Sequence, residues 1–169
     1  MVTKFLLSIH VLAAILAIGP IAIAASMFPR FGRQLAARTH PRETAHVPPG
    51  AEPPGAEEGT AALLHRICRV YAVVGIVVPV FGIATGKQLG VLTDAWLITS
   101  IILTVLAAAL LGFVILPAQE RLLDTGADSS PEKARLVAAR LGMVTGVFNL
   151  LWAVVVVLMI VRPGSTTGV

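Results

Sequence analysis

The sequence predicts an all-α fold, a four-helix transmembrane bundle whose helices run up-down-up-down as a single integral membrane domain over residues 1–169. Of the 169 residues, 56% are hydrophobic and only 13% are charged, whereas a soluble domain carries about 25% charged residues. An apolar helix of about 20 residues crosses the hydrocarbon core of a bilayer. Four apolar stretches approach or exceed this length and are separated by polar segments, at about 5–28, 67–86, 96–116 and 141–161.

The first stretch, 5–28, is expected to stay in the mature protein as a helix. It resembles a secretory signal in having Lys4 before an apolar run and small residues near its end. The run is much longer than the 7–15 residues typical of a signal core, and most positive charge follows it, from Arg30 onward. Gly19-Pro20 is expected to bend this helix, because proline removes a backbone donor.

The second stretch reaches membrane length only if its basic start, His65 to Arg69, lies among lipid headgroups. Pro79 is expected to bend this helix. Before it, segment 40–59 contains the pentapeptide PPGAE twice in succession. Such Pro- and Gly-rich sequence favours extended chain, so we expect a mobile linker here.

The third stretch, 96–116, is followed by helix-stopping Thr125-Gly126. Ser129 or Ser130 can then cap a new helix that has Pro131 in its first turn. The sequence therefore predicts a fourth helix from Pro131 to Val161. At 1.5 Å per residue this helix is roughly 46 Å long, so its first turns should extend beyond the bilayer.

Small residues and buried hydrogen bonds should hold the helices together, because lipid weakens any hydrophobic drive between them. Asn149 lies well inside the fourth stretch and should face another helix, with Thr99, Ser100 and Thr104 as candidate partners. The predicted packing residues are Gly82, Gly86, Gly142, Gly146 and Asn149.

The distribution of positive charge predicts the orientation in the cell membrane. Loops 29–66 and 117–140, with the adjoining helix ends, hold ten Lys and Arg residues, whereas the other side holds only Lys4, Lys87 and Arg162. The positive-inside rule places both loops in the cytoplasm and both termini outside. The basic residues lie beside the spans, which favours anionic lipid headgroups over nucleic acid as partner. Other membrane protein subunits are a further candidate partner.

Few residues suggest chemistry. The spans contain no central Asp, Glu, Lys or Arg, which argues against a proton- or ion-coupled transporter. The single cysteine, Cys68, is expected to be an inert packed thiol. His65, Arg66 and Arg69 form a basic patch, which either anchors the helix in headgroups or binds a specific anionic lipid or an acidic partner.

His10 is the candidate for ligand binding. It is either hydrogen-bonded at the membrane boundary or a ligand to haem or a metal ion. His65 lies at the opposite depth, so a haem held by two histidines is difficult to build. Met159 lies at about the same depth as His10, which leaves a His/Met axial pair open.

The opening, Lys4-Phe5-Leu6-Leu7-Ser8-Ile9-His10-Val11-Leu12-Ala13-Ala14 with Gly19, resembles the first helix of a bacterial family of predicted integral membrane proteins of unknown function. The ending Leu158-Met159-Ile160-Val161-Arg162-Pro163 resembles the close of that family. The wider group is similar to copper-resistance-D-like proteins and to four-helix membrane proteins linked to haem b and protoporphyrinogen oxidation. The resemblance implies a functional role for His10. The chain departs from those proteins in lacking a second intramembrane histidine.

The leading expectation is thus a bacterial non-enzymatic membrane protein, an accessory or assembly subunit, without a cofactor. One alternative is a haem b-binding or redox protein that uses His10. Another is copper handling, with His10 and Met159 as soft-metal ligands.

Overall fold

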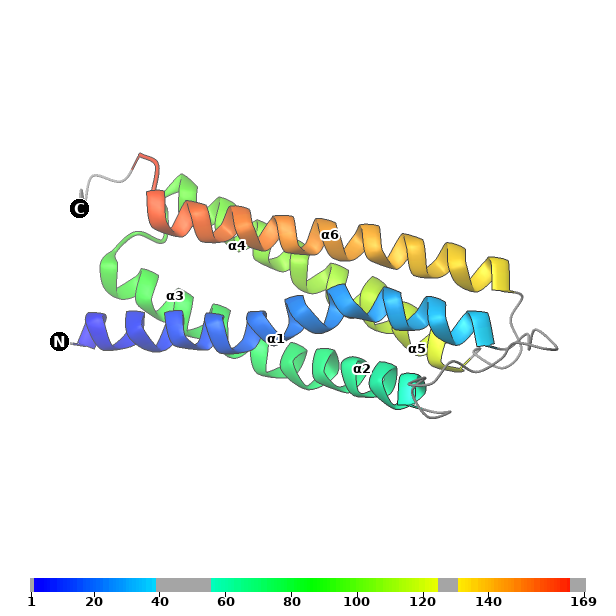
Figure 1. Ribbon diagram of the computed structural model, residues 1–169. Helices are drawn as coiled ribbons and strands as arrows, with labels where there is room; N and C mark the ends of the chain where they lie inside the picture. The colour runs from blue at the N-terminus through cyan, green and yellow to red at the C-terminus, as the bar shows by residue number, and fades with distance from the viewer. Residues whose placement is uncertain (1, 39–55, 125–130, 165–169) are drawn as a thin grey trace.

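In the computed structural model, which describes residues 2–38, 56–124 and 131–164, every regular element is a helix. These elements pack lengthwise as an elongated bundle (Figure 1). In chain order they are α1 (Val2–Arg38), α2 (Ala56–Gly75), α3 (Val77–Leu89), α4 (Ala95–Ala109), the π-helix η1 (Leu110–Ile115), α5 (Leu116–Asp124) and α6 (Pro131–Val161).

Four helical segments of the described chain are long and apolar enough to cross a membrane: Val2–Phe31, Glu58–Leu89, Ala95–Asp124 and Arg135–Val161. In the most apolar window of each segment, only 11–17% of the residues are buried inside the bundle. The remaining apolar surface would be unfavourable in water and is stable against lipid. The predicted all-helical fold with four apolar helices of membrane-spanning length is confirmed for the described residues.

Both described ends of the chain lie at one end of the bundle, together with the turn between α3 and α4 (Figure 1). We call this the terminal end, and it holds residues 2–10, 82–100 and 155–164. The opposite end, where α1 ends and α2, α5 and α6 meet the undescribed segments, is called the loop end.

The second apolar stretch breaks between α2 and α3, at Ile76. The predicted distortion of the helix by Pro79 is therefore confirmed, and the break lies three residues before the proline. Proline has no N–H to donate to the carbonyl of Gly75, and its ring crowds that carbonyl, so the helix is interrupted one turn before the proline. The Ile76 N–H instead donates to the carbonyl of Val73 at 3.2 Å, a tighter turn.

Two boundaries can be compared directly with the sequence. The predicted helix from Pro131 to Val161 is confirmed as α6. The predicted mobile linker 40–59 is wrong at its end, because α2 already begins at Ala56. Glu58 lies in the first turn of α2, where a carboxylate stabilises the positive end of the helix dipole. Residues 40–55 lie outside the described part of the chain.

The larger hydrophobic core occupies the loop-end half of the bundle. Its fully buried centre includes Phe28 of α1, Ile115 of η1 and Phe148 of α6. A second, smaller cluster lies at the terminal end, where Val91, Trp96 and Leu97 pack with Ile101 and Met159. At the terminal end, the side chains of α1, α3, α4 and α6 do not fill the space between these helices completely.

The predicted glycine contacts hold at some positions and are wrong at one. A Cβ on Gly82 would stand 2.8 Å from Cε1 of His10, and one on Gly86 would stand 3.0 Å from Leu97, so both glycines permit close helix contacts. A Cβ on Gly142 would make only ordinary contact, 3.8 Å from Pro29. Gly146 has nothing within 4 Å. The buried face of α6 passes through Thr145 and Phe148 instead, so Gly146 is turned outward.

Asn149 does face another helix, but its partner belongs to the first helix and not to the third apolar stretch. Its Nδ2 donates to Oγ of Ser26 at 3.0 Å. Thr99, Ser100 and Thr104 instead donate to backbone carbonyls one turn earlier in their own helix. In an apolar environment this local bond satisfies a hydroxyl without a second helix.

Candidate ligand-binding cavity

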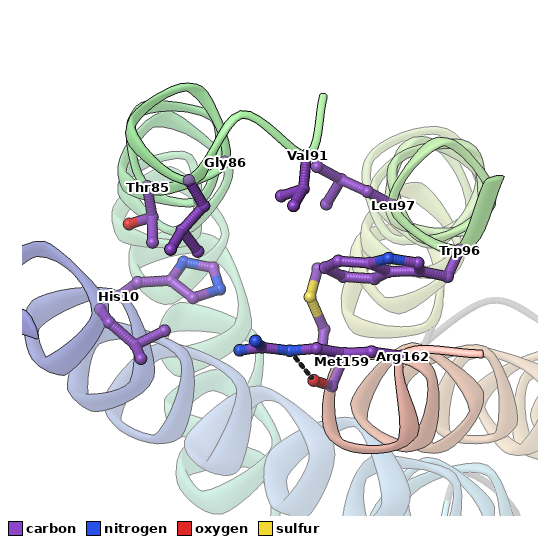
Figure 2. Close-up of a pocket in the computed structure, with 11 residues that line it drawn as sticks. His10, Thr85, Gly86, Val91, Trp96, Leu97, Met159 and Arg162 are labelled. Carbon is purple, nitrogen blue, oxygen red and sulfur yellow. Dashed lines mark hydrogen bonds between the residues drawn. The ribbon is translucent and has the colours of Figure 1, made fainter. Parts of the chain in front are cut away.

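A small cavity lies at the terminal end among α1, α3, α4 and α6 (Figure 2). It offers about 40 Å³, a few times the roughly 10–15 Å³ that one water molecule requires. The wall is largely apolar. Its lining residues are Leu7, His10, Gly82, Thr85, Gly86, Leu89, Val91, Trp96, Leu97, Met159 and Arg162.

His10 is fixed in one orientation by α3. Its Nδ1 lies 2.9 Å from the carbonyl oxygen of Val78, and because a carbonyl only accepts, Nδ1–H is the donor. The imidazole lies against the backbone of Gly82, where any side chain would occupy its space. Neutral imidazole with Nδ1 protonated carries a free lone pair on Nε2. The ring lies at the wall of the cavity (Figure 2).

This arrangement is the one by which proteins prepare a histidine as a ligand. A metal-binding histidine almost always donates its second ring N–H to a carbonyl, carboxylate or water, which fixes the tautomer and the direction of the lone pair. The same bond also satisfies a histidine that has no ligand, so the geometry allows ligand binding and does not require it.

Arg162 enters the cavity from the end of α6. Its backbone is left-handed, with φ 46°, a conformation that costs energy for a residue other than glycine. Its N–H still donates to the carbonyl of Leu158 at 2.9 Å, which closes the helix end. The turn directs the side chain back over the bundle, where its Nε donates to the carbonyl of Met159 at 3.3 Å.

The guanidinium group of Arg162 lies over the indole ring of Trp96, 5.7 Å from the ring centre. This is a cation–π contact. Trp96 is itself held in place, because its Nε1 donates to Oδ2 of Asp94 at 3.0 Å. Figure 2 shows the guanidinium group reaching into the space between Trp96 and His10.

The cavity wall has an unbalanced charge. Of its lining residues only Arg162 carries a formal charge. Within the described part of the chain, the two terminal amino groups of its guanidinium have no hydrogen-bond partner. The cavity therefore contains unused donors on a cation and, at Nε2 of His10, an unused acceptor.

Met159 lines the same cavity as His10, although the two residues are 149 positions apart in the chain. Met159 packs against the cluster of Val91, Trp96 and Leu97, and its thioether lies beside the Trp96 ring (Figure 2). Lys87 is exposed and does not line the cavity.

Comparison of the chain with models of known protein families, with curated proteins and with solved structures found no match. The case for a function therefore depends on the residues of the chain and their geometry.

The structure does not bring His65, Arg66 and Arg69 into this site, since they lie on α2 toward the loop end. His65 is bonded within the bundle: its Nδ1 lies 3.1 Å from Oε1 of Gln119, and the amide of Gln119 donates to Sγ of Cys68 at 3.7 Å. Arg66 and Arg69 are exposed.

Two features of the structure do not follow from the sequence. Trp96, the first residue of the third predicted stretch, is 6% exposed and forms a wall of the cavity. Gln119 was not singled out, yet it is completely buried between His65 and Cys68. Gln119 lies three residues past the third predicted stretch, directly before Glu120 and Arg121, so its position in the sequence does not indicate that it is buried.

The cavity can be compared with the two ligands raised by the sequence. Haem is far larger than the space of about 40 Å³, so the cavity would have to widen to admit it. A single metal ion fits by size. Among the described residues no group of three or more His, Cys, Asp and Glu side chains comes together, so such an ion would depend on His10 and Met159.

Proposed function

We propose that this chain is a non-enzymatic membrane protein with an accessory role, which holds a small ligand in the terminal cavity through Nε2 of His10. One observation carries the proposal: the Nδ1–H of His10 is bonded to Val78, which leaves the lone pair of Nε2 at the cavity. The wall adds one cation, one thioether and one aromatic face. These groups are suited to holding a ligand in place.

In the membrane, the proposed arrangement is up-down-up-down in the cell membrane of a bacterium, with both termini and the terminal cavity outside. The excess of Lys and Arg around loops 29–66 and 117–140 supports this orientation. Exposed Arg66 and Arg69 at the loop end would then meet anionic headgroups of the inner leaflet.

Trp96 provides a direct test, because it lines the cavity and the chain has only two tryptophans. In a Trp152→Phe protein, all indole fluorescence comes from Trp96. The purified protein is titrated with silver(I) as a soft-metal probe and with inorganic phosphate as an anionic probe. We expect at least one probe to change Trp96 emission in a saturable way. The bound probe should be recovered chemically unchanged after release, since the proposed protein binds its ligand without converting it.

His10→Ala should abolish that response, whereas His65→Ala, which removes a histidine outside the cavity, should retain it. If neither probe gives a response that depends on His10, the proposal of a His10-centred ligand site is wrong.

Copper handling is a second candidate, favoured by the presence of Met159 in the same cavity as His10. Imidazole and thioether together suit a soft monovalent ion such as copper(I). Met159→Leu preserves the volume and removes the sulfur. If copper is the ligand, this substitution weakens silver(I) binding at least tenfold and leaves phosphate binding unchanged. Equal silver(I) affinity in both proteins would dismiss this candidate.

A further inference from the structure

The charge of the terminal cavity narrows the class of ligand. The guanidinium group of Arg162 lies at the cavity with two amino groups that have no partner among the described residues. A metal ion would meet a like charge there, in surroundings where apolar side chains weaken screening. An oxyanion instead receives charge-assisted hydrogen bonds from the planar fork of the guanidinium group.

The second constraint comes from His10. With Nδ1–H donated to Val78, Nε2 of the neutral ring is an acceptor, so the group that meets it must donate a hydrogen. An oxyanion without hydrogen would place an oxygen lone pair against the nitrogen lone pair. A ligand that combines an anionic oxygen with an O–H therefore satisfies both Arg162 and the neutral ring of His10.

The third constraint is size. A space of about 40 Å³ admits a compact group of a few heavy atoms and not a whole metabolite. A protonated phosphate group meets all three conditions, because it carries anionic oxygens and an O–H on the same phosphorus atom. A carboxylate lacks the O–H once it is ionised, and sulfate lacks it at any neutral pH.

We propose that the terminal cavity binds a protonated phosphate group, with Arg162 donating to its anionic oxygens and Nε2 of His10 accepting its O–H. This inference rests on the proposed function, since it names the ligand class of the same site. The phosphate group comes either from a free phosphate or from the headgroup of a phosphomonoester lipid whose chains lie in the outer leaflet.

Three substitutions are suited to testing this proposal. The left-handed φ of 46° at Arg162 is tolerated by asparagine, so Arg162→Asn removes the guanidinium group without demanding a new backbone conformation. His10→Phe keeps a ring on Gly82 and removes the acceptor. Gly19→Ala is the control in α1, because nothing lies within 4 Å of its Cβ position.

The experiment uses the Trp152→Phe protein in nanodiscs at about pH 7, where inorganic phosphate still carries an O–H. In discs of phosphatidylcholine alone, inorganic phosphate is expected to change Trp96 emission, with sulfate at least tenfold weaker. Arg162→Asn and His10→Phe should each weaken phosphate binding at least tenfold, and Gly19→Ala should not.

A second set of discs contains phosphatidic acid and no free phosphate. If the source is a lipid, these discs shift Trp96 emission in the parent protein and not in Arg162→Asn, and free phosphate adds nothing. If the source is free phosphate, only the first set responds. Either pattern supports the inference.

The inference is overturned if sulfate and phosphate bind equally, or if Arg162→Asn leaves phosphate binding unchanged. A silver(I) response that depends on His10 would, in that case, preserve the proposed function while dismissing phosphate. The absence of every response that depends on His10 would dismiss both.

Discussion

At the scale of single residues, Gly82 and His10 form one unit. The glycine is required by the imidazole, because a Cβ at this position would approach Cε1 of His10 to 2.8 Å. The ring in turn uses its Nδ1–H to bind the carbonyl of Val78, four residues before Gly82 on α3. Gly82, which the sequence suggests as a helix-packing position, thus leaves the space that the ring of His10 occupies.

Replacing Gly82 by alanine should therefore displace His10 at little cost to stability. Alanine favours the helix by about 1 kcal/mol, and the loss of one hydrogen bond costs a similar amount. We expect Gly82→Ala to melt in detergent near the parent protein and Gly19→Ala to melt higher. If Gly82→Ala gains as much stability as Gly19→Ala, the imidazole does not lie against α3.

At the scale of helices, adjacent residues of α6 lie on its buried and outward faces. Thr145 is buried, whereas Gly146 lies beside empty space. Gly86 on α3 has the opposite surroundings, with Leu97 and Leu92 at 3.0 and 3.1 Å from its Cβ position. The pattern Gly-xxx-Gly occurs on both helices, so the pattern alone does not identify a contact.

Leucine substitutions should distinguish these two glycines. Gly86→Leu should destabilise the bundle by about 1–3 kcal/mol, because the new side chain enters occupied space. Gly146→Leu should leave the melting temperature in detergent unchanged or raise it, since leucine is the better helix former. A large loss in Gly146→Leu would mean that another chain packs against this face of α6.

A hydrogen bond from Asn149 to Ser26 adds to the apolar packing between α1 and α6. Membrane hydrogen bonds of this kind contribute about 1 kcal/mol or less. Asn149→Leu also removes Oδ1, a buried oxygen that has no partner in the described structure, which offsets part of the loss. We expect Asn149→Leu and Ser26→Ala to lower stability by at most about 1 kcal/mol each, measured by detergent melting, and the double variant to add nothing further.

At the scale of the whole molecule, accessibility from outside the cell tests the proposed orientation. Thr93, exposed in the turn after α3, is a suitable labelling site at the terminal end. Gly164 is less suitable, because a cysteine there would have to adopt a left-handed φ of 79°. In a Cys68→Ala background, Thr93→Cys should react with a membrane-impermeant thiol reagent in intact cells. Lys133→Cys, exposed at the loop end, should react only after the cells are opened. The reverse pattern would place the terminal cavity in the cytoplasm.

The sequence predicts the parts of this molecule that depend on composition and local signals. The length and apolar character of the four long helices, the start and end of α6, and the interruption caused by Pro79 follow from apolar length and the chemistry of proline. The predicted helix stop at Thr125-Gly126 and the cap at Ser129 or Ser130 lie outside the described residues. The shared depth of His10 and Met159 follows from helix rise. Their common cavity, and the turn of Arg162 over Trp96, required knowledge of helix rotation and of one backbone angle.

The partners of polar side chains were less predictable for a related reason. The neighbour of Asn149 depends on the angular position of α1 against α6, and no periodicity in the sequence determines that angle. The same is true of Gln119, whose bonds to His65 and Cys68 join residues more than 50 positions away in the chain.

The unequal division of the hydrophobic core has a consequence for motion. The loop-end half is held by a large cluster that includes Phe28, Ile115 and Phe148, whereas the terminal half has a small cluster around Trp96. Local opening requires least free energy where the fewest buried contacts are lost. The terminal half can therefore separate transiently while the loop half stays closed, with the break at Ile76 as a hinge for α3. Amide hydrogens of α3 should then exchange with solvent sooner than those of α2, which would give a ligand its route to His10.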